Sequence, residues 1–241
     1  HIIPGLSAFV GGDITAGILA SGMLEQEAST LLIDLGTNGE MALGNRHRLH
    51  ACATAAGPAF EGGANRGIWG ADMVRLLQKL LEEGLMDGQG LLKEPYFTKG
   101  VRIGDVLVTK ESVRAVQLAK GAIAAGIEIL ADSYGIRFSD ISKVVLAGGF
   151  GYYLDPKAAV AIGLLPEELA DCTVTGGNTA LSGAAMVGSR ILTAGGKQTA
   201  EGTLPDGGDD LRKRQELQIR ILNLAEEEKF PETFLTKINF N

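Results

Sequence analysis

Hydrophobic positions recur along the chain with two different periods, and the alternation between them predicts an α/β fold. Short apolar runs separated by glycine-containing turns predict strands, whereas apolar residues three and four positions apart predict helices. The predicted strands are 31–35, 40–43, 47–53, 144–146, 172–175 and 217–221, and the predicted helices are 13–21, 71–83, 112–134, 156–162, 179–192 and a closing helix after Pro231. The first three strands form a meander, and the whole order indicates a mixed sheet with helical cover.

Two segments follow neither period. Residues 87–100 mix Gly, Pro and Lys and predict a connecting loop, after which 101–108 is a strand or an irregular edge. Residues 195–210 are rich in Gly, Thr and Asp and predict an exposed loop. Within the longest helix, Ser112 is the expected N-cap, and Gly121 and Gly126 indicate close packing of another element in preference to a close ligand.

The run LLIDLGTNGE at residues 31–40 carries the clearest candidate chemistry. An acidic residue, Asp34, ends a buried strand, where a carboxylate needs a partner or a cation. The turn that follows contains Gly36, Thr37, Asn38 and Gly39, whose amides and side chains can converge on an anion. The pattern therefore predicts a Mg-phosphate hairpin with Asp34 as the metal residue, although an ordinary β-hairpin has the same Asn-Gly signal.

A second glycine-rich turn follows another buried strand, in the run VVLAGGFG at residues 144–151. Glycines after a strand allow the backbone to approach a nucleotide closely, so Gly148, Gly149, Phe150 and Gly151 are candidate nucleotide-binding residues. A simple strand-to-helix turn is the alternative. The chain contains neither the dinucleotide fingerprint G-x-G-x-x-G at a helix start nor a P-loop sequence.

The run CATAAGPAFEGG at residues 52–63 is a candidate third wall of the same site. Its small residues and the pair Gly57-Pro58 would bring a loop close to a phosphate or a ribose. Glu61 would hold a metal-bound water or a ribose hydroxyl, and is the second candidate catalytic carboxylate after Asp34. A tight turn into the next element is the alternative.

Composition excludes several classes of function. The net charge of −7 argues against a nucleic-acid backbone as ligand, and no apolar run approaches the ~20 residues of a membrane span. The two cysteines, Cys52 and Cys172, are expected to be small buried residues in a reducing compartment. His47 and His50 are not expected to share a metal ion, because side chains three apart on a strand point to opposite faces. We expect surface positions for them and no covalent nucleophile.

Five motifs in this order resemble the reductive activators of corrinoid proteins. They are PGLSAFVGGDITAG at 4–17, the Asp34 hairpin, GPAFEG at 57–62, AGGFG at 147–151 and GNTAL at 177–181, and the closing strand and helix at the end of the chain are also similar. Members of that family are ATP-driven metallo-electron-transfer proteins. The resemblance covers nearly the whole chain and corresponds to the family's C-terminal ATPase region.

The resemblance implies an RNase H-like α/β fold of the superfamily that includes acetate and sugar kinases, heat-shock chaperones and actin. It implies that the Asp34 hairpin is the second phosphate loop, that 147–151 is the adenosine loop and that 57–61 lines the nucleotide cleft. The expected organisation is one C-terminal ATPase domain, 1–241, of a longer protein. Its parts are an N-terminal segment 1–29, a nucleotide-binding core 30–194, an exposed loop 195–216 and a closing strand and helix 217–241.

The chain departs from the family pattern in two respects. The family's iron–sulfur domain and first phosphate loop are not in this sequence, and two distant cysteines cannot supply the about four thiolates of a cluster. The chain begins at His1 without an initiating methionine, so we expect a portion of a longer protein with part of the active site elsewhere.

The expected function is ATP binding and hydrolysis, with Mg²⁺, that drives reductive activation of a corrinoid protein by an iron–sulfur domain of the same longer protein. Composition and cysteine content predict a cytoplasmic location, and a homodimer is a possible partner. Two alternatives stay open: a small-molecule kinase of the same superfamily, and a noncatalytic nucleotide-binding or partner-docking module. The kinase needs an acceptor base, and no motif other than Asp34 supplies one.

Overall fold

A computed structural model describes residues 2–36, 38–57, 59, 70–193 and 216–240 of the chain. Its α-helices are α1 (Gly12–Ser21), α2 (Gly70–Glu82), α3 (Tyr96–Lys99), α4 (Lys110–Tyr134), α5 (Gly148–Gly151), α6 (Pro156–Ala161), α7 (Thr179–Thr193) and α8 (Phe230–Lys237). Its strands are β1 (Ser29–Leu35), β2 (Gly39–Gly44), β3 (Arg48–Thr54), β4 (Val101–Ile103), β5 (Val106–Val108), β6 (Ile141–Ala147), β7 (Thr173–Gly177) and β8 (Gln218–Leu222). All the predicted strands and helices listed above are confirmed to within a few residues.

One six-stranded mixed sheet organises the chain, in the order β7-β6-β1-β2-β3-β8. The strands β1, β2 and β3 form the predicted antiparallel meander, and β6 pairs in parallel with β1 on the other side. At the two edges, β7 pairs in parallel with β6, and β8 pairs in parallel with β3. This register sets Asp34 of β1 between Glu40 of β2 and Ala147 of β6, so the two glycine-rich turns begin side by side.

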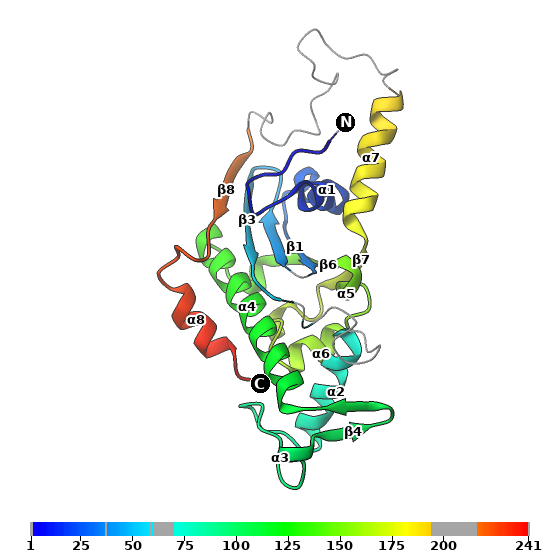
Figure 1. The fold of residues 1–241 in the computed structure, drawn as a ribbon. Coiled ribbons are helices and arrows are strands. Elements are labelled where there is room, and N and C mark those ends of the chain that lie inside the picture. The colour runs from blue at the N-terminus through cyan, green and yellow to red at the C-terminus, as the bar shows by residue number, and fades with distance from the viewer. Residues whose placement is uncertain (1, 37, 58, 60–69, 194–215, 241) are drawn as a thin grey trace.

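Helices cover both faces of the sheet, as Figure 1 shows. The helices α1 and α7 pack together on one face, over a core that contains Leu32, Ala42 and Val145. The long helix α4 crosses the other face, over a core that contains Ile33, Met41 and Leu146. Because alternate residues of a strand point to opposite faces, Asp34 and Glu40 share the face of Leu32 and Ala42 and project beside the start of α1.

Close helix packing explains two interior glycines of α4. A Cβ on Gly121 would lie 3.2 Å from the Cα of Ile238, and one on Gly126 would overlap the side chain of Met41. The preference for packing over a ligand is therefore confirmed at both positions. The expected N-cap is wrong: Thr109 caps α4 by accepting a hydrogen bond from the backbone N–H of Ser112, which is the third residue of the helix.

The C-terminal segment is fixed against α4. The Lys120 ammonium group, 1% exposed, donates a hydrogen bond to the Asn239 carbonyl and lies 5.4 Å from the ring centroid of Phe240. The backbone N–H of Phe240 in turn donates to the Gly88 carbonyl at 2.7 Å. Figure 1 shows α8 lying along α4, with the C-terminus near its lower end. Lys120 therefore holds residues 239 and 240 against α4.

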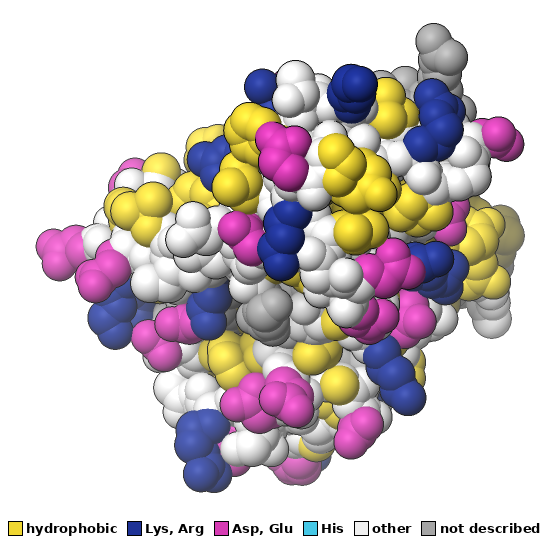
Figure 2. Space-filling model, turned by 90° about the horizontal axis from the view of Figure 1, so that it is seen from below, with side chains coloured by type: hydrophobic (Ala, Val, Ile, Leu, Met, Phe, Trp, Pro, Cys, Tyr) yellow, Lys and Arg dark blue, Asp and Glu magenta, His cyan; other side chains and the backbone are white. Residues whose placement is uncertain are grey.

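The predicted loop at 87–100 contains the short helix α3, and 101–108 forms the hairpin β4–β5. The predicted loop at 195–210 lies outside the described residues. Among the helices that the structure describes, none combines the length and apolar character needed to cross a membrane. The face in Figure 2 mixes acidic, basic and apolar side chains, and shows no continuous basic patch among its described residues.

Candidate nucleotide site

The site centres on Asp34, at the end of β1. Its hairpin is short, and the backbone N–H of Gly36 donates to the Asn38 carbonyl at 3.2 Å. The glycine loop after β6 lies directly against it, because a Cβ on Gly148 would be 2.5 Å from Asp34 Oδ1. Gly148 has a φ of +85°, which favours glycine. Only glycine thus fits both the backbone and the space at this position.

The electrostatics of the site are those of uncompensated carboxylates. Burial, and then the charge of Asp13, raise the pKa of Asp34 from its ordinary 3.8 to about 6. Burial, Asp13 and Asp34 raise the pKa of Glu40 from 4.5 to about 7, against a lowering hydrogen bond from the Gly11 backbone. Ionised carboxylates here need a cation.

Sequence reasoning missed Asp13 and Glu40. Asp13 lies in the first turn of α1, and Glu40 stands directly opposite Asp34 across the β1–β2 pair. The Asn38-Gly39 turn signal gives a different register, because a two-residue turn there would set residue 37 opposite Glu40, whereas the structure pairs Leu35 with Gly39 and therefore Asp34 with Glu40. Asp13 is remote in sequence, and only the packing of α1 on the sheet brings it near.

The glycines of the second loop have different roles. Gly149 is exposed, and a Cβ built on it meets nothing within 4 Å, so a ligand can approach its backbone. Phe150 is 7% exposed and its side chain belongs to the core. Gly151 is buried against Leu146 of β6. Gly148 thus lies against Asp34 and Gly149 leaves its backbone exposed, whereas Phe150 and Gly151 are packed into the core.

Of the remaining predicted site residues, the structure describes Gly39 and Gly57. A Cβ on Gly39 would lie 2.8 Å from the Thr54 hydroxyl, so packing explains this glycine. Gly57 has a φ of +73° with open space around it. Thr37, Pro58 and Glu61 lie outside the described residues, and the proposed third wall is untested there.

The residues present suit Mg²⁺ bound with a phosphate. Within the described part of the chain, no three His, Cys, Asp or Glu side chains form a group that could hold a metal ion. Mg²⁺ is usually bound through only one or two carboxylates together with water and substrate phosphates. Asp34 supplies one such carboxylate, and because burial and the charge of Asp13 raise its pKa, its ionised form would be stabilised by a bound cation.

The other reactive side chains considered above, those of Cys52, His47 and His50, make contacts outside this site. Cys52 is fully buried, which raises the pKa of its thiol to about 12, as expected for a structural cysteine. His47 is half exposed and lies 3.0 Å from a carboxylate oxygen of Glu27. His50 is 9% exposed and packs edge-on against Tyr134, so the expectation of a surface position is wrong for this residue.

Comparison with known proteins identifies the family. Residues 28–66 and 64–194 match the family model described as the C-terminal domain of RACo, the ASKHA domain. The chain belongs to this family. The family expected from the motifs is therefore confirmed, and so is the actin and sugar-kinase fold class.

Two relatives extend the match. The chain is 35% identical over 222 residues to the corrinoid activation enzyme RamQ of Eubacterium limosum, covering 68% of this chain and 37% of RamQ. It is 26% identical over 229 residues to the Co(II) methylated amine-specific corrinoid protein reductase of Methanosarcina barkeri, covering 74% and 42% of the two chains.

A solved structure confirms the ASKHA fold over nearly the whole chain. The reductive activator for corrinoid,iron-sulfur protein superimposes with a TM-score of 0.79 at 28% identity, covering 99% of this chain and 44% of that one. The chain thus spans less than half the length of each of these relatives.

Proposed function

We propose that this domain binds and hydrolyses ATP with Mg²⁺ and thereby drives the reductive activation of a corrinoid protein. The electrons would come from an iron–sulfur domain outside this chain. The nucleotide part is supported by the close approach of Gly148 to Asp34, where an added Cβ would lie 2.5 Å from Asp34 Oδ1, and by the pairing of β1 with β6, which sets the two glycine-rich turns side by side. The printed names of the relatives, which refer to corrinoid activation, support the biological part.

In this proposal the hairpin holds the phosphates. Asp34 would hold Mg²⁺, and the Gly36, Asn38 and Gly39 amides, with Thr37, would contact the β- and γ-phosphates. Bound Mg²⁺ would neutralise charge that develops on the transferred phosphoryl group. Position and charge supply most of the catalysis of phosphoryl transfer, so no reactive side chain is required.

The second loop contacts the nucleoside. Gly148 and Gly149 face the adenosine, because the open space beside Gly149 leaves its backbone accessible. Phe150 and Gly151 fix the loop from behind. Gly57, Pro58 and Glu61 complete the cleft as the family pattern implies.

Asp13 gives the proposal a candidate for orienting the attacking water. Its charge raises the pKa of both Asp34 and Glu40, so it lies within electrostatic reach of the hairpin. The same carboxylate favours the second candidate function, phosphoryl transfer to a small-molecule hydroxyl, because a kinase needs an acceptor base.

A noncatalytic docking module is the remaining alternative. A homodimer and a cytoplasmic location stay predictions.

Calorimetric titration of the chain with Mg-ATP and Mg-ADP tests the nucleotide proposal. We expect both to bind, and Asp34→Asn to weaken both relative to a matched surface variant, Asp105→Asn. ADP release that depends on an added small-molecule acceptor would favour the kinase, and binding without turnover would favour the docking module. If neither Mg-ATP nor Mg-ADP bound to the chain, the proposal would be contradicted.

A further inference from the structure

Helix α8 and the residues on either side of it form a strap across α4, defined here as residues 229–240 (Figure 1). None of the residues of α8 itself is buried. Two ion pairs tie the strap to α4, in which Lys237 lies 2.7 Å from Glu128 and Lys229 lies 3.2 Å from Asp132. All four side chains are partly exposed, and ion pairs of this kind contribute little to stability. The helical part of the strap is therefore weakly held.

The end of the strap is anchored more deeply than its helix. Phe240 is 6% exposed and belongs to the core on the α4 side of the sheet, and its backbone N–H donates to the Gly88 carbonyl. Lys120 of α4 is buried beside it, where the ammonium group donates a hydrogen bond to the Asn239 carbonyl and faces the ring of Phe240. Lys120 is thus the charged component of the anchor.

The charge of Lys120 has no acidic partner among the residues that the structure describes. No ion pair between those residues involves Lys120. On the strap, Lys237 adds a second positive charge, and the carboxylate of Glu128 is already paired with Lys237. In the loop that receives the Phe240 N–H, the Asp87 carboxylate accepts hydrogen bonds from backbone N–H groups of its own loop. Burial without a counter-ion favours the neutral amine over the ammonium ion.

Opening of the strap is consequently linked to the protonation of Lys120. Burial, and then the charge of Lys237, lower the pKa of Lys120 from 10.5 to about 8. When the strap lifts, the side chain meets water and its pKa returns to the ordinary value, so the open state holds a proton that the closed state releases. Closure is therefore favoured as the pH rises through about 8, and this gain is complete near 10.5. From these two pKa values, the equilibrium constant for opening should fall about twentyfold between pH 7.5 and 9.5.

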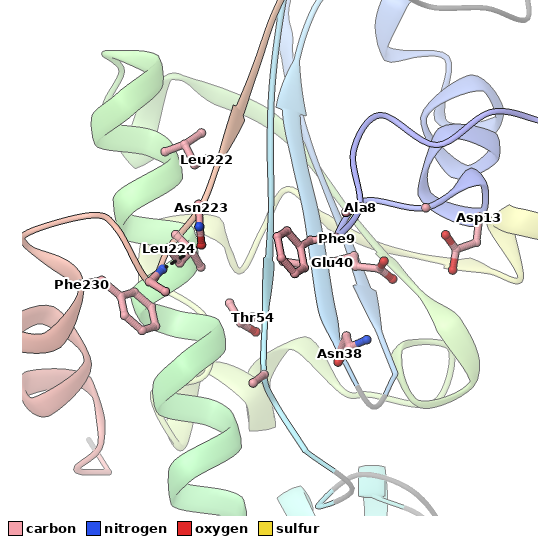
Figure 3. Close-up of a pocket in the computed structure, with 14 residues that line it drawn as sticks. Ala8, Phe9, Asp13, Asn38, Glu40, Thr54, Leu222, Asn223, Leu224 and Phe230 are labelled. Atoms are coloured by element: carbon pink, nitrogen blue, oxygen red, sulfur yellow. Dashed lines mark hydrogen bonds between the residues drawn. The ribbon is translucent and has the colours of Figure 1, made fainter.

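The other end of the strap lies beside the candidate nucleotide site. A cavity of about 500 Å³ at that site has Asn38 and Glu40 of the hairpin on one side and Leu224 and Phe230 on the other, as Figure 3 shows. Phe230 is the first residue of α8. Lifting the strap would therefore open the apolar wall of this cavity, which β8 and α8 provide.

We propose that residues 229–240 are a proton-sensitive strap, and that release of the Lys120 proton to water locks it closed over α4. No covalent bond changes in this step, and the proton is taken up again when the strap opens. Lys120 acts as a positioning residue for the strap and does not contact a ligand. The proposal is independent of the nucleotide proposal, because the lock involves none of the residues of the candidate nucleotide site.

Amide exchange measured by NMR tests the lock through the backbone N–H of Phe240. Its protection factor, the ratio of the intrinsic to the observed exchange rate at each pH, should rise about twentyfold between pH 7.5 and 9.5. Lys120→Met keeps an apolar stem but has no proton to release, so the Phe240 protection factor in this variant should be the same at both pH values. Lys157→Met, which replaces an exposed lysine of α6, is the matched control and should show the rise of the natural chain.

The backbone N–H of Leu32 in β1 separates opening of the strap from unfolding of the whole chain. It should be at least about tenfold better protected than the Phe240 N–H at pH 7.5, and equal protection of the two would overturn the proposal. A Phe240 protection factor that is the same at both pH values in the natural chain, or that rises equally in Lys120→Met, would also overturn it. An NMR titration of the Lys120 side-chain carbon in the natural chain needs no variant: a midpoint near pH 8 supports the lock, and a midpoint near 10.5 excludes it.

Discussion

Replacing Asp34 with Asn should stabilise the ligand-free chain at neutral pH. Burial and the charge of Asp13 raise the pKa of Asp34 from 3.8 to about 6, so at pH 7.5 the folded chain holds a carboxylate that ionises more readily when unfolded. The displacement corresponds to about 3 kcal/mol. Because the side chain is partly exposed to water, we expect a gain of about 1–2 kcal/mol in the free energy of unfolding.

The pH dependence follows from the same displacement. A carboxyl whose folded pKa is raised contributes stability that is fully present below pH 3.8 and is lost as the pH rises through about 6. The advantage of Asp34→Asn over the natural chain should therefore be largest above pH 7 and should disappear near pH 4. Urea unfolding at three pH values between these limits measures it.

Ligand binding should change in the opposite direction. If Asp34 orients Mg²⁺, the variant that gains stability should lose at least about tenfold in Mg-ATP affinity, equivalent to ~1.4 kcal/mol. Asp105→Asn, an exposed substitution in the β4–β5 turn, should change neither quantity. The reasoning would be refuted if Asp34→Asn were no more stable than the natural chain at pH 7.5, or if its advantage were the same at pH 4.

Three further predictions concern the two loops and the chain end. Gly148→Ala should destabilise the chain by about 1–3 kcal/mol in urea unfolding, because Gly148 has a positive φ and lies against the Asp34 carboxylate. Gly149→Ala is the control and should have little effect on stability. Equal losses of stability in the two variants would contradict a close approach of Gly148 to Asp34. Asp13→Asn should lower the pKa of Glu40, measured by NMR titration of its side-chain carbon, and an unchanged value would show that the two charges do not interact. Burial, with Lys237 nearby, lowers the pKa of Lys120 to about 8. Because the folded state then releases the Lys120 proton at a lower pH than the unfolded state, the natural chain should gain up to ~2 kcal/mol in the free energy of unfolding between pH 7.5 and 9.5. Lys120→Met should lack this gain, and parallel pH profiles of the two chains would exclude a role for the Lys120 proton.

The order of elements was predictable because each strand and helix carries its own hydrophobic period. The meander after residue 30 and the long helix α4 are examples, and the structure moves their ends by only a few residues. The N-cap of α4 was misplaced because Thr109 and Ser112 form a capping box together, and either hydroxyl has the right chemistry.

The candidate site was predictable only where its residues follow one another in sequence. The hairpin after Asp34 and the loop after β6 each have a local glycine signal, and parallel pairing of β1 with β6 brings them together. Asp13 and the apolar wall from β8 and α8 depend on tertiary packing of distant segments, which no local pattern encodes. His50 was assigned to the surface because nothing in its neighbourhood indicates that Tyr134 covers it.

Amide hydrogen exchange of the chain with and without Mg-ADP tests the central claim most directly, because it reports on both glycine-rich turns at once. The account predicts slower exchange in residues 34–39 and 147–151 when the nucleotide binds, with smaller changes in β4 and β5. Protection confined to other segments, or no protection in either turn at saturating Mg-ADP, would contradict a nucleotide site built from these two loops.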